Sequence, residues 1–590
     1  MNSITRPELL QAETPIPTRR SGLVFAVKAA GLRLQRRWRD RAAPLPRLAH
    51  GDPRAYPALI AESVTPLWSD PRQSEARHQF GKVENLRRAA WHFDGLVLPA
   101  DGVFSFWGQL GRPTRGRGFV PGRMLREGCL TAATGGGLCQ ISNALFAVAL
   151  EADCAIVERH AHSRIVPGSA AALGRDATVA WNYVDLRFRA PRELMLRVSL
   201  SASSLIVQLR GRAAAMPARR NPSTLFRSAT RIANDCGSCS AVTCHRHEGS
   251  LPRALGRSAF LLDEAWPEFR AYVRERKARG DLLAIPLDGR RWGKPRYAWE
   301  TEGFAKVATA SLASLAQSWA ARHATGNGQR VAVQLRRSEA IARKLAKNLT
   351  PDMTEVCVAQ SLLPFLWRMG VLGGRRVTVL MTRLPMAMLQ ARLDAFAAIN
   401  PERATLADFR APATLVGAET EALAAADRIV TPHALIAAQF PGRAERLDWH
   451  LPASRPLPRK SQSRTIAFPG PTLARKGAHE LRAAALGLDC EIALLGGDLE
   501  GAGFWHGLAT RPAARDGAWL SEAAAVVQPA LIEEQPRALL AALAAGVPVI
   551  ASQACGIVAR PGVTLVPEGD SAALRQALER LFQDIAHNRH

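Results

Sequence analysis

One cysteine lies where a thiol could act as a nucleophile. Cys139 follows three consecutive glycines at positions 135–137 and comes just before the apolar run 141–150, whose spacing predicts a helix. Backbone N–H groups in the first turn of a helix lack helical partners and carry the positive end of the helix dipole, so they stabilise a thiolate. The pattern therefore predicts a reactive cysteine at the start of a helix.

Histidines and aspartates that could complete such a site follow along the chain. His160 and His162 stand two residues apart in a segment predicted as a strand, so we expect them on one face, and either could be the base. Asp176 or Asp185, in the next predicted strand, could orient the imidazole. We take Cys139, His160, His162 and Asp185 as candidate catalytic residues. The alternative is a buried structural cysteine beside structural or metal-binding histidines.

A second group of residues is typical of a phosphate and sugar site. A turn after the predicted strand 465–468 carries Gly470, Arg475 and Lys476, and a predicted helix begins next to it at residue 478. A cation beside the free N–H groups of a helix N-terminus suits a diphosphate. Farther on, a strand-to-helix turn carries carboxylates that can accept hydrogen bonds from sugar hydroxyls. The candidate donor-binding residues are Gly470, Arg475, Lys476, Glu533, Glu534 and Arg537.

A third group could hold a metal. Cys236, Cys239, Cys244 and His245 lie within ten positions, a suggestive spacing for zinc or one corner of an iron–sulfur cluster. The second cysteine pair of a zinc ribbon is missing, so a redox pair or a plain connector is the alternative. No other cofactor is indicated.

Composition limits the class of protein. A chain of 590 residues with 47% hydrophobic and 22% charged residues is long enough for about four globular domains. The net charge of +27 favours anionic partners, but no nucleic-acid motif accompanies it, so phosphate-bearing small molecules or lipid headgroups fit better than nucleic acid. The nine scattered cysteines favour a reducing compartment, and no run of eighteen apolar residues predicts a transmembrane helix.

The N-terminal 50 residues form a basic leader. Their short apolar stretch is interrupted by Lys28 and followed by several arginines, which does not suit an export signal. A basic amphipathic helix at a membrane surface and a solvated tail are the two interpretations.

Strands and helices alternate along the C-terminal part. Predicted strands at 465–468, 490–495, 525–527 and 547–551 are separated by helical segments at 478–486 and 537–545, and a helix at 571–582 follows. This order predicts a parallel sheet with helices on both faces. A weaker repeat of the pattern, with strands at 330–333, 354–358, 377–380 and 428–430, predicts a second α/β lobe.

Several separated motifs resemble the VanW family. They lie at residues 84–86, 104–107, 135–142, 158–163 and 183–188, in the order of that family, and the resemblance covers about residues 75–210. It implies an α+β domain in a bacterial protein with a loose link to cell-envelope or glycopeptide-resistance biology. It implies no established reaction.

Residues 463–585 resemble the C-terminal half of a retaining glycosyltransferase of the GT-B fold, similar to glycosyltransferase family four, and residues 256–455 resemble its N-terminal half loosely. The resemblance implies that Lys476 holds the donor diphosphate and that Glu533 meets the transferred sugar. Two positions depart from the family: the second Glu falls on Ala541, and the Arg after the glycine of the phosphate turn falls on Pro471. Loss of these contacts would weaken donor binding by a few kcal/mol, because each charge-assisted contact contributes about 1.5 to 3 kcal/mol.

We therefore predict a multidomain fusion. A leader (1–50) precedes an α+β VanW-like domain (75–212), a Cys/His connector (213–255), and two α/β lobes, 256–455 and 463–585, arranged as in a double Rossmann-like GT-B enzyme. The predicted activity is transfer of a sugar from a nucleotide-sugar donor to a lipid-linked or polysaccharide acceptor, in the cytoplasm or peripherally at the inner membrane. The rivals are a Cys-His-Asp thiol hydrolase or acyltransferase with a degenerate sugar-nucleotide site, and a scaffold without activity.

Overall fold

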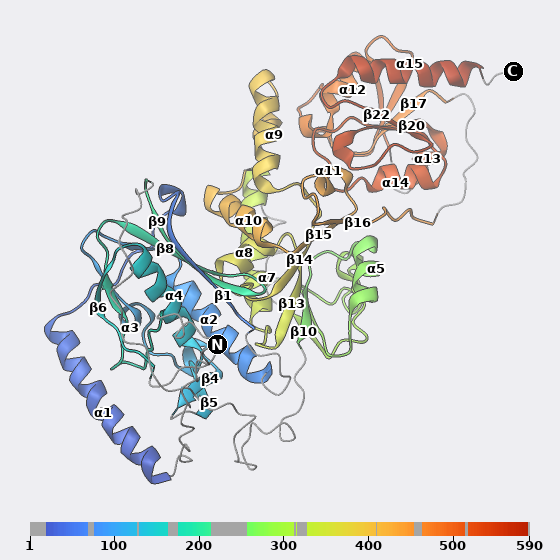
Figure 1. Ribbon diagram of the computed structural model, residues 1–590. Helices are drawn as coiled ribbons and strands as arrows, with labels where there is room; N and C mark the ends of the chain where they lie inside the picture. The colour runs from blue at the N-terminus through green and yellow to red at the C-terminus, as the bar shows by residue number, and fades with distance from the viewer. Residues whose placement is uncertain are drawn as a thin grey trace, which may run out of the picture. The chain divides into compact units, whose positions relative to one another are not determined.

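The computed structural model describes residues 19–68, 76–126, 129–162, 175–213, 256–311, 314, 327–408, 410–453, 463–513 and 517–587 (Figure 1). The chain divides into two compact units. The first contains Met1–Arg257 with the short segments Thr350–Thr354 and Met369–Arg376, and the second contains the remainder.

The first unit mixes antiparallel sheets with helices. A four-stranded sheet has the order β1-β9-β8-β2, a three-stranded sheet the order β3-β7-β6, and β4 and β5 form a hairpin. The strands are β1 (Ala58–Pro66), β2 (Leu96–Leu98), β3 (Val103–Ser105), β4 (Pro121–Arg126), β5 (Cys129–Thr134), β6 (Ala155–Glu158), β7 (Arg187–Arg189), β8 (Leu194–Leu200) and β9 (Ser204–Gly211). The predicted α+β class is confirmed. Because β1 pairs along β9, the sheet includes residues upstream of position 75, where we expected the domain to begin.

Apolar side chains from the helices fill the core of this unit. Helix α2 (Ala76–Phe93) packs on β8, and α4 (Leu138–Glu151) packs on β1 and β9. Phe93 contacts both Phe104 and Phe106, the latter in the short helix α3 (Phe106–Leu110), in edge-to-face geometry, which suits aromatic rings in a close-packed interior. The predicted helix after Cys139 is α4.

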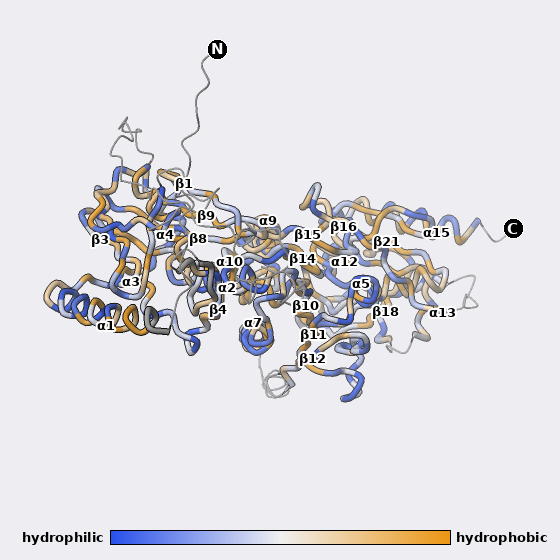
Figure 2. Tube along the Cα trace, turned by 60° about the horizontal axis from the view of Figure 1, so that its bottom comes forward, coloured by the Kyte–Doolittle hydropathy of each residue, from blue (hydrophilic) through white to orange (hydrophobic). Residues whose placement is uncertain are grey.

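The basic leader contains helix α1 (Arg19–Ala42). Hydrophobic and hydrophilic residues mix along it (Figure 2). Arg36 and Asp40 fasten α1 to the rest of the unit through ion pairs with Glu158 and Arg187. Within the described ranges, no helix combines the length and the apolar character that crossing a bilayer requires.

The second unit contains two sheets. A seven-stranded sheet has the order β12-β11-β10-β13-β14-β15-β16, and a six-stranded sheet has the order β19-β18-β17-β20-β21-β22, with every neighbouring pair of the latter parallel. The strands of these two sheets are β10 (Arg257–Leu261), β11 (Leu282–Ile285), β12 (Lys306–Thr309), β13 (Met353–Ala359), β14 (Arg376–Leu380), β15 (Arg428–Thr431), β16 (Ala444–Arg446), β17 (Thr465–Phe468), β18 (Glu491–Leu494), β19 (Ala509–Pro512), β20 (Ala523–Gln528), β21 (Val549–Ser552) and β22 (Val563–Val566).

Helices alternate with these strands, as a parallel sheet requires. Those of the first lobe are α5 (Pro267–Arg276), α7 (Asn327–Ala346), α8 (Leu363–Arg368), α9 (Met386–Ile399), α10 (Ala413–Ala425) and α11 (Ala434–Ala437), and those of the second are α12 (Ala478–Ala485), α13 (Trp519–Glu522), α14 (Arg537–Ala544) and α15 (Ser571–His587). Figure 2 shows α5 and α7 as largely hydrophilic. The prediction of two α/β lobes built on mainly parallel sheets is confirmed.

One predicted strand is wrong. Residues 330–333 lie inside helix α7. The alternation of valines there is short, whereas the buried Ser338, Ile341, Ala342 and Leu345 recur at the spacing of one helix face. The longer pattern determines the structure.

Candidate functional site

A cavity of about 580 Å³ opens in the second lobe of the second unit. It lies at the carboxyl ends of β17 and β20, where parallel sheets bind ligands. Its lining is Pro469, Gly470, Pro471, Arg475, Lys476, Leu495, Trp519, Gln528, Glu533, Glu534, Gln535 and Ala538. Of the predicted donor-binding residues, all but Arg537 line this cavity.

A close backbone contact holds the turn before α12 against the segment after β20 that carries Glu533. Gly477 begins α12 with φ +82°, and a Cβ atom there would stand 2.2 Å from the carbonyl oxygen of Pro529. Only glycine accepts both the left-handed conformation and this approach. The Arg475 carbonyl also accepts hydrogen bonds from the N–H groups of Leu531 and Ile532. Residues 475–477 are thereby fixed beside residues 529–532.

Lys476 and Glu533 form a buried ion pair at the wall of the cavity. Lys476 Nζ lies 2.7 Å from Glu533 Oε2, and the two side chains are 12% and 5% exposed. The amide of Gln528 donates to the same carboxylate oxygen, and the N–H of Gln535 donates to the other at 2.9 Å. Burial works to raise the pKa of Glu533, but the charge and hydrogen bond of Lys476, the Gln535 N–H and the charge of Arg475 together hold that pKa below its ordinary value. Glu533 is therefore an anion surrounded by donors.

Pro471 and Ala541, the two positions that depart from the pattern of the glycosyltransferase family, supply no charged or polar side chain to the site. Pro471 lines the cavity with an apolar ring, and Ala541 lies within α14. Arg537, a predicted donor-binding residue, points elsewhere: its guanidinium binds both oxygens of Glu268 at 2.7 and 2.8 Å and stacks on Trp266. It joins the two lobes of this unit.

A second group of reactive side chains lies in the first unit, at the start of α4. Gly137 caps this helix with φ +96°, and the partly exposed Cys139 lies in its first turn. The thiol lies 3.5 Å from the Thr178 hydroxyl and 3.9 Å from the Val179 carbonyl oxygen. Burial works to raise the pKa of Cys139, but hydrogen bonding and the charge of His162 lower it below its ordinary value. The thiol is thus set up to ionise readily.

His162 connects the thiol to a buried carboxylate. Its Nδ1 contacts Asp176 Oδ1 closely, and its backbone N–H donates to Oδ2 at 2.6 Å. Burial opposes the charged imidazole, but Asp176 and Cys139 together raise the pKa of His162 to about 10. Burial works to raise the pKa of the fully buried Asp176, but the hydrogen bonds and charge of His162, together with the charge of Arg159, lower it.

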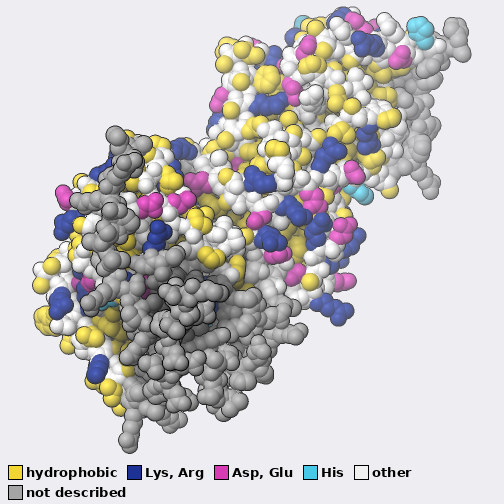
Figure 3. All heavy atoms as spheres, viewed as in Figure 1, with side chains coloured by type: hydrophobic (Ala, Val, Ile, Leu, Met, Phe, Trp, Pro, Cys, Tyr) yellow, Lys and Arg dark blue, Asp and Glu magenta, His cyan; other side chains and the backbone are white. Residues whose placement is uncertain are grey.

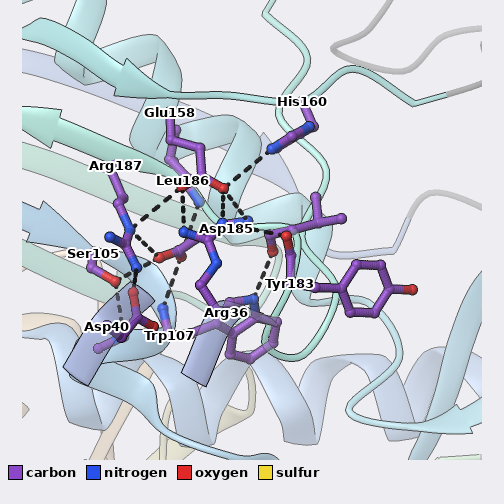
Figure 4. Close-up of polar contacts among 12 residues, drawn as sticks. Arg36, Asp40, Ser105, Trp107, Glu158, His160, Tyr183, Asp185, Leu186 and Arg187 are labelled. Atoms are coloured by element: carbon purple, nitrogen blue, oxygen red, sulfur yellow. Dashed lines mark hydrogen bonds and ion pairs between the residues drawn. The ribbon is translucent and has the colours of Figure 1, made fainter. Parts of the chain in front are cut away.

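The other two candidates lie in a different cluster (Figure 4). His160 Nε2 lies 3.2 Å from Glu158, which also binds Arg36 of α1. The Asp185 carboxylate accepts from the Ser105 hydroxyl at 2.6 Å and from Arg187 at 2.8 Å. Asp176, not Asp185, therefore contacts His162. The expectation that both histidines share one face of a strand is also wrong. Strand β6 ends at Glu158, before either histidine, and the two imidazoles contact different carboxylates, Glu158 and Asp176.

Buried hydrogen bonds hold the thiol cluster together. Asn85, fully buried in α2, donates to the Gly136 carbonyl oxygen at 2.9 Å and so fixes the glycine turn. The carbonyl of Ala177 accepts from Ser142 of α4, and its N–H donates to Asn143 at 2.8 Å. Helix α4 and the segment that carries Asp176 and Thr178 are therefore joined through the adjacent residues Ser142 and Asn143.

Sequence reasoning did not find several of these residues. Asn85 and Thr178 act through contacts with segments far along the chain, whereas Gln528 and Gln535 lie within five positions of Glu533, the carboxylate that they contact. Cys236, Cys239, Cys244 and His245 lie outside the described residues, and the part of the chain that is described gathers no set of three or more metal-ligating side chains.

Charged side chains are interspersed on the face of the molecule seen in Figure 3. Lys and Arg alternate there with Asp and Glu over the parts that are drawn in colour. On this face, the positive charge of the chain is not gathered into a single basic patch.

Two segments of the chain match known protein families. Residues 81–210 match the family described as VanW like protein, and residues 477–584 match the family described as Glycosyl transferases group 1. The vancomycin B-type resistance protein VanW of Enterococcus faecalis is 32% identical over 141 residues, 23% of this chain and 50% of that protein. The uncharacterized protein YoaR of Bacillus subtilis is 34% identical over 130 residues, 22% of this chain and 42% of that protein. The chain thus spans half or less of the length of these relatives.

Among solved structures, sucrose-phosphate synthase from Thermosynechococcus elongatus aligns with 56% of this chain and 90% of its own, with a TM-score of 0.37 and 14% identity. The two family matches confirm the predicted fusion of a VanW-like region with a glycosyltransferase-like region.

Proposed function

We propose that this chain, which joins a VanW-like region to a glycosyltransferase group 1 region, transfers a glycosyl group from a nucleoside-diphosphate sugar. The observation that carries the proposal is the cavity in which Lys476 and Glu533 meet beside the start of α12. Its volume of about 580 Å³ lies in the range of small-molecule sites.

Different residues of the cavity suit different parts of the donor. The ammonium of Lys476 and the N–H groups that begin α12 suit the diphosphate, with Arg475 as a second cation on the wall. The Glu533 carboxylate and the Gln528 amide suit sugar hydroxyls. In the transfer, the bond from the anomeric carbon to the phosphate oxygen breaks, the acceptor oxygen bonds to that carbon, and the acceptor proton leaves with the nucleoside diphosphate. Lys476 would stabilise the charge that grows on the leaving group.

The finer form of this proposal concerns the acceptor, which we infer to be lipid-linked or part of an envelope polysaccharide. Helix α1 supports it, because Leu23, Val27, Leu34 and Trp38 are exposed and recur at the spacing of one helix face. Arginines and Lys28 on the same helix complement anionic lipids. The Enterococcus relative is named a vancomycin B-type resistance protein, in line with the link to cell-envelope or glycopeptide-resistance biology that the VanW resemblance implies.

Isothermal calorimetry with UDP-glucose, GDP-mannose and the corresponding free diphosphates tests donor binding. We expect at least one donor to bind, with the affinity reduced about tenfold or more in Lys476→Gln, since loss of a charge-assisted contact costs about 1.5 to 3 kcal/mol. The matched control is Lys344→Gln, because Lys344 is an exposed lysine of α7. Folded protein that takes up none of a wider panel of nucleotide sugars would contradict the proposal.

Sedimentation with lipid vesicles tests the membrane contact separately. We expect binding to vesicles of phosphatidylglycerol but not of phosphatidylcholine, and loss of binding in the double variant Leu34→Ser, Trp38→Ser. Equal recovery of both vesicle types, or of neither, would contradict a role for α1 at an anionic surface.

A further inference from the structure

A thiol, an imidazole and a buried carboxylate converge in the first unit, outside the glycosyltransferase region. They come from the first turn of α4, from the segment after β6, and from the segment that α4 holds through Ser142 and Asn143. Nothing in the proposed sugar transfer uses them.

Three buried cysteines of the described chain show what a structural cysteine looks like here. Cys154, Cys357 and Cys555 are buried, and burial raises the pKa of each to about 12. Cys139 is partly exposed and interacts with His162, which itself contacts Asp176. The arrangement is therefore specific to Cys139 among these four thiols.

We propose that the first unit carries a second active site, in which Cys139 is the nucleophile and His162 the general acid and base, for substrates with an ester or amide carbonyl. Asp176 acts as a positioning residue, since it holds the Nδ1 side of the ring and leaves Nε2 for proton transfer. Cys139 follows the glycine turn that Asn85 holds through the Gly136 carbonyl oxygen, so the fold determines where the thiol lies.

The chemistry balances with water or an amine as the second reactant. The Cys139 thiolate adds to the carbonyl carbon, and the S–C bond forms as the bond from that carbon to the leaving oxygen or nitrogen breaks. His162 gives its proton to the leaving group. Water or an amine then attacks the thioester and loses a proton to His162, and the thiolate leaves with its electron pair. N–H groups in the first turn of α4 can stabilise the oxyanion of each tetrahedral state.

Alkylation of the intact protein by iodoacetamide, followed by peptide mass spectrometry, tests the nucleophile. Cys490 is the internal reference, because it is partly exposed and burial raises its pKa. At pH 6.5 we expect Cys139 to react at least about tenfold faster than Cys490, since each unit of pKa changes the thiolate fraction tenfold. Equal rates, or a Cys139 profile that rises only above pH 9, would overturn the proposal.

A matched pair of histidine variants tests the base. His162→Gln should slow alkylation of Cys139 at pH 6.5 about tenfold or more and move its pH profile upward. His160→Gln should leave the profile unchanged, because His160 faces Glu158. Asp176→Asn should move the profile in the same direction as His162→Gln, by less. A purely structural pair would alter thermal stability without moving the profile, and that result would overturn the assignment.

The acyl step is tested with p-nitrophenyl acetate. We expect a burst of nitrophenol and an acetyl group recovered on Cys139, absent in Cys139→Ala and reduced in His162→Gln. Fast alkylation with no acetylation, or acetylation of Cys490 to the same extent, would overturn the acyl chemistry. Nucleotide-sugar binding should be unchanged in Cys139→Ala, so this test fails or succeeds independently of the proposed glycosyl transfer.

Discussion

Each unit has a buried carboxylate paired with a basic side chain, Asp176 with His162 and Glu533 with Lys476, but the two pairs suit different chemistry. Asp176 is fully buried against His162, and Glu533 is 5% exposed against Lys476. An imidazole can give up and regain its proton during a reaction, whereas a lysine ammonium keeps its charge and presents three donors. The first pair therefore suits proton transfer and the second suits an anionic ligand. The identity of the cation, more than the geometry of the pair, separates the two sites.

Both sites also rest on glycines that allow backbones to approach closely. A Cβ atom at Gly136 would stand 2.1 Å from the Gly122 carbonyl oxygen, and one at Gly477 would stand 2.2 Å from that of Pro529. Gly477 directly follows Lys476, and Gly136 lies three positions before Cys139. The two unrelated sites thus use the same solution to fix a short turn.

The largest effect should come from removing one member of the lysine pair. Lys476→Ala leaves the Glu533 charge buried without its cation, which should lower the free energy of unfolding by about 3 to 5 kcal/mol. The double variant Lys476→Ala, Glu533→Gln should recover part of that loss, because the buried charge is gone. Urea unfolding followed by circular dichroism measures both. If the double variant is no more stable than Lys476→Ala, the unpaired charge of Glu533 does not account for the loss of stability.

Replacement of Gly477 should come next in size. Gly477→Ala adds a backbone clash to the strain of positive φ, and each contributes about 1 to 3 kcal/mol. The matched control is Gly487→Ala, where φ is +75° but a Cβ would meet nothing within 4 Å. The difference in unfolding free energy between the two variants isolates the clash. Equal losses would mean that the contact with Pro529 relaxes easily.

Alkaline pH should weaken the first site and leave the second unaffected. The raised pKa of His162 contributes stability that is complete below its ordinary value of 6.5 and is lost as pH rises from there through its folded pKa of about 10. The loss should reach at most about 1.4 kcal/mol per pH unit. The lowered pKa of Glu533 has the opposite sense: its contribution is complete above 4.5 and is lost as pH falls below its folded pKa.

Hydrogen exchange read by mass spectrometry follows the two sites separately. Peptides of α4 and residues 175–180 should open more readily between pH 7 and 10, after correction for the intrinsic exchange rate, and those of β17 and α14 should not. Asp176→Asn should remove most of this dependence. A uniform response across both units would contradict the distinction between histidine and lysine pairs.

Most regular elements could be predicted from sequence in both units, but the contacts that complete the thiol cluster of the first unit could not. Strand β17 begins and ends where the pattern placed it, and α12 ends one residue earlier, because short alternating segments determine each element locally. The choice between Asp176 and Asp185 depends on how an irregular segment folds back onto α4, and no periodicity encodes that path. Nor could composition show that Arg537 would be held by Glu268, which lies 269 positions away.

The smallest effect on stability should come from an exposed ion pair, which shares opposite charges with the His162–Asp176 and Lys476–Glu533 pairs but not their burial. Glu339 and Arg343 of α7 lie 2.9 Å apart, but their side chains are 41% and 63% exposed. Water screens both charges and already solvates each one, so Glu339→Gln should change the free energy of unfolding by about 0.5 kcal/mol or less. Urea unfolding beside Lys476→Ala gives the comparison directly. A loss as large as that of Lys476→Ala would mean that pairing itself, rather than burial of the carboxylate, accounts for the stability of the two sites.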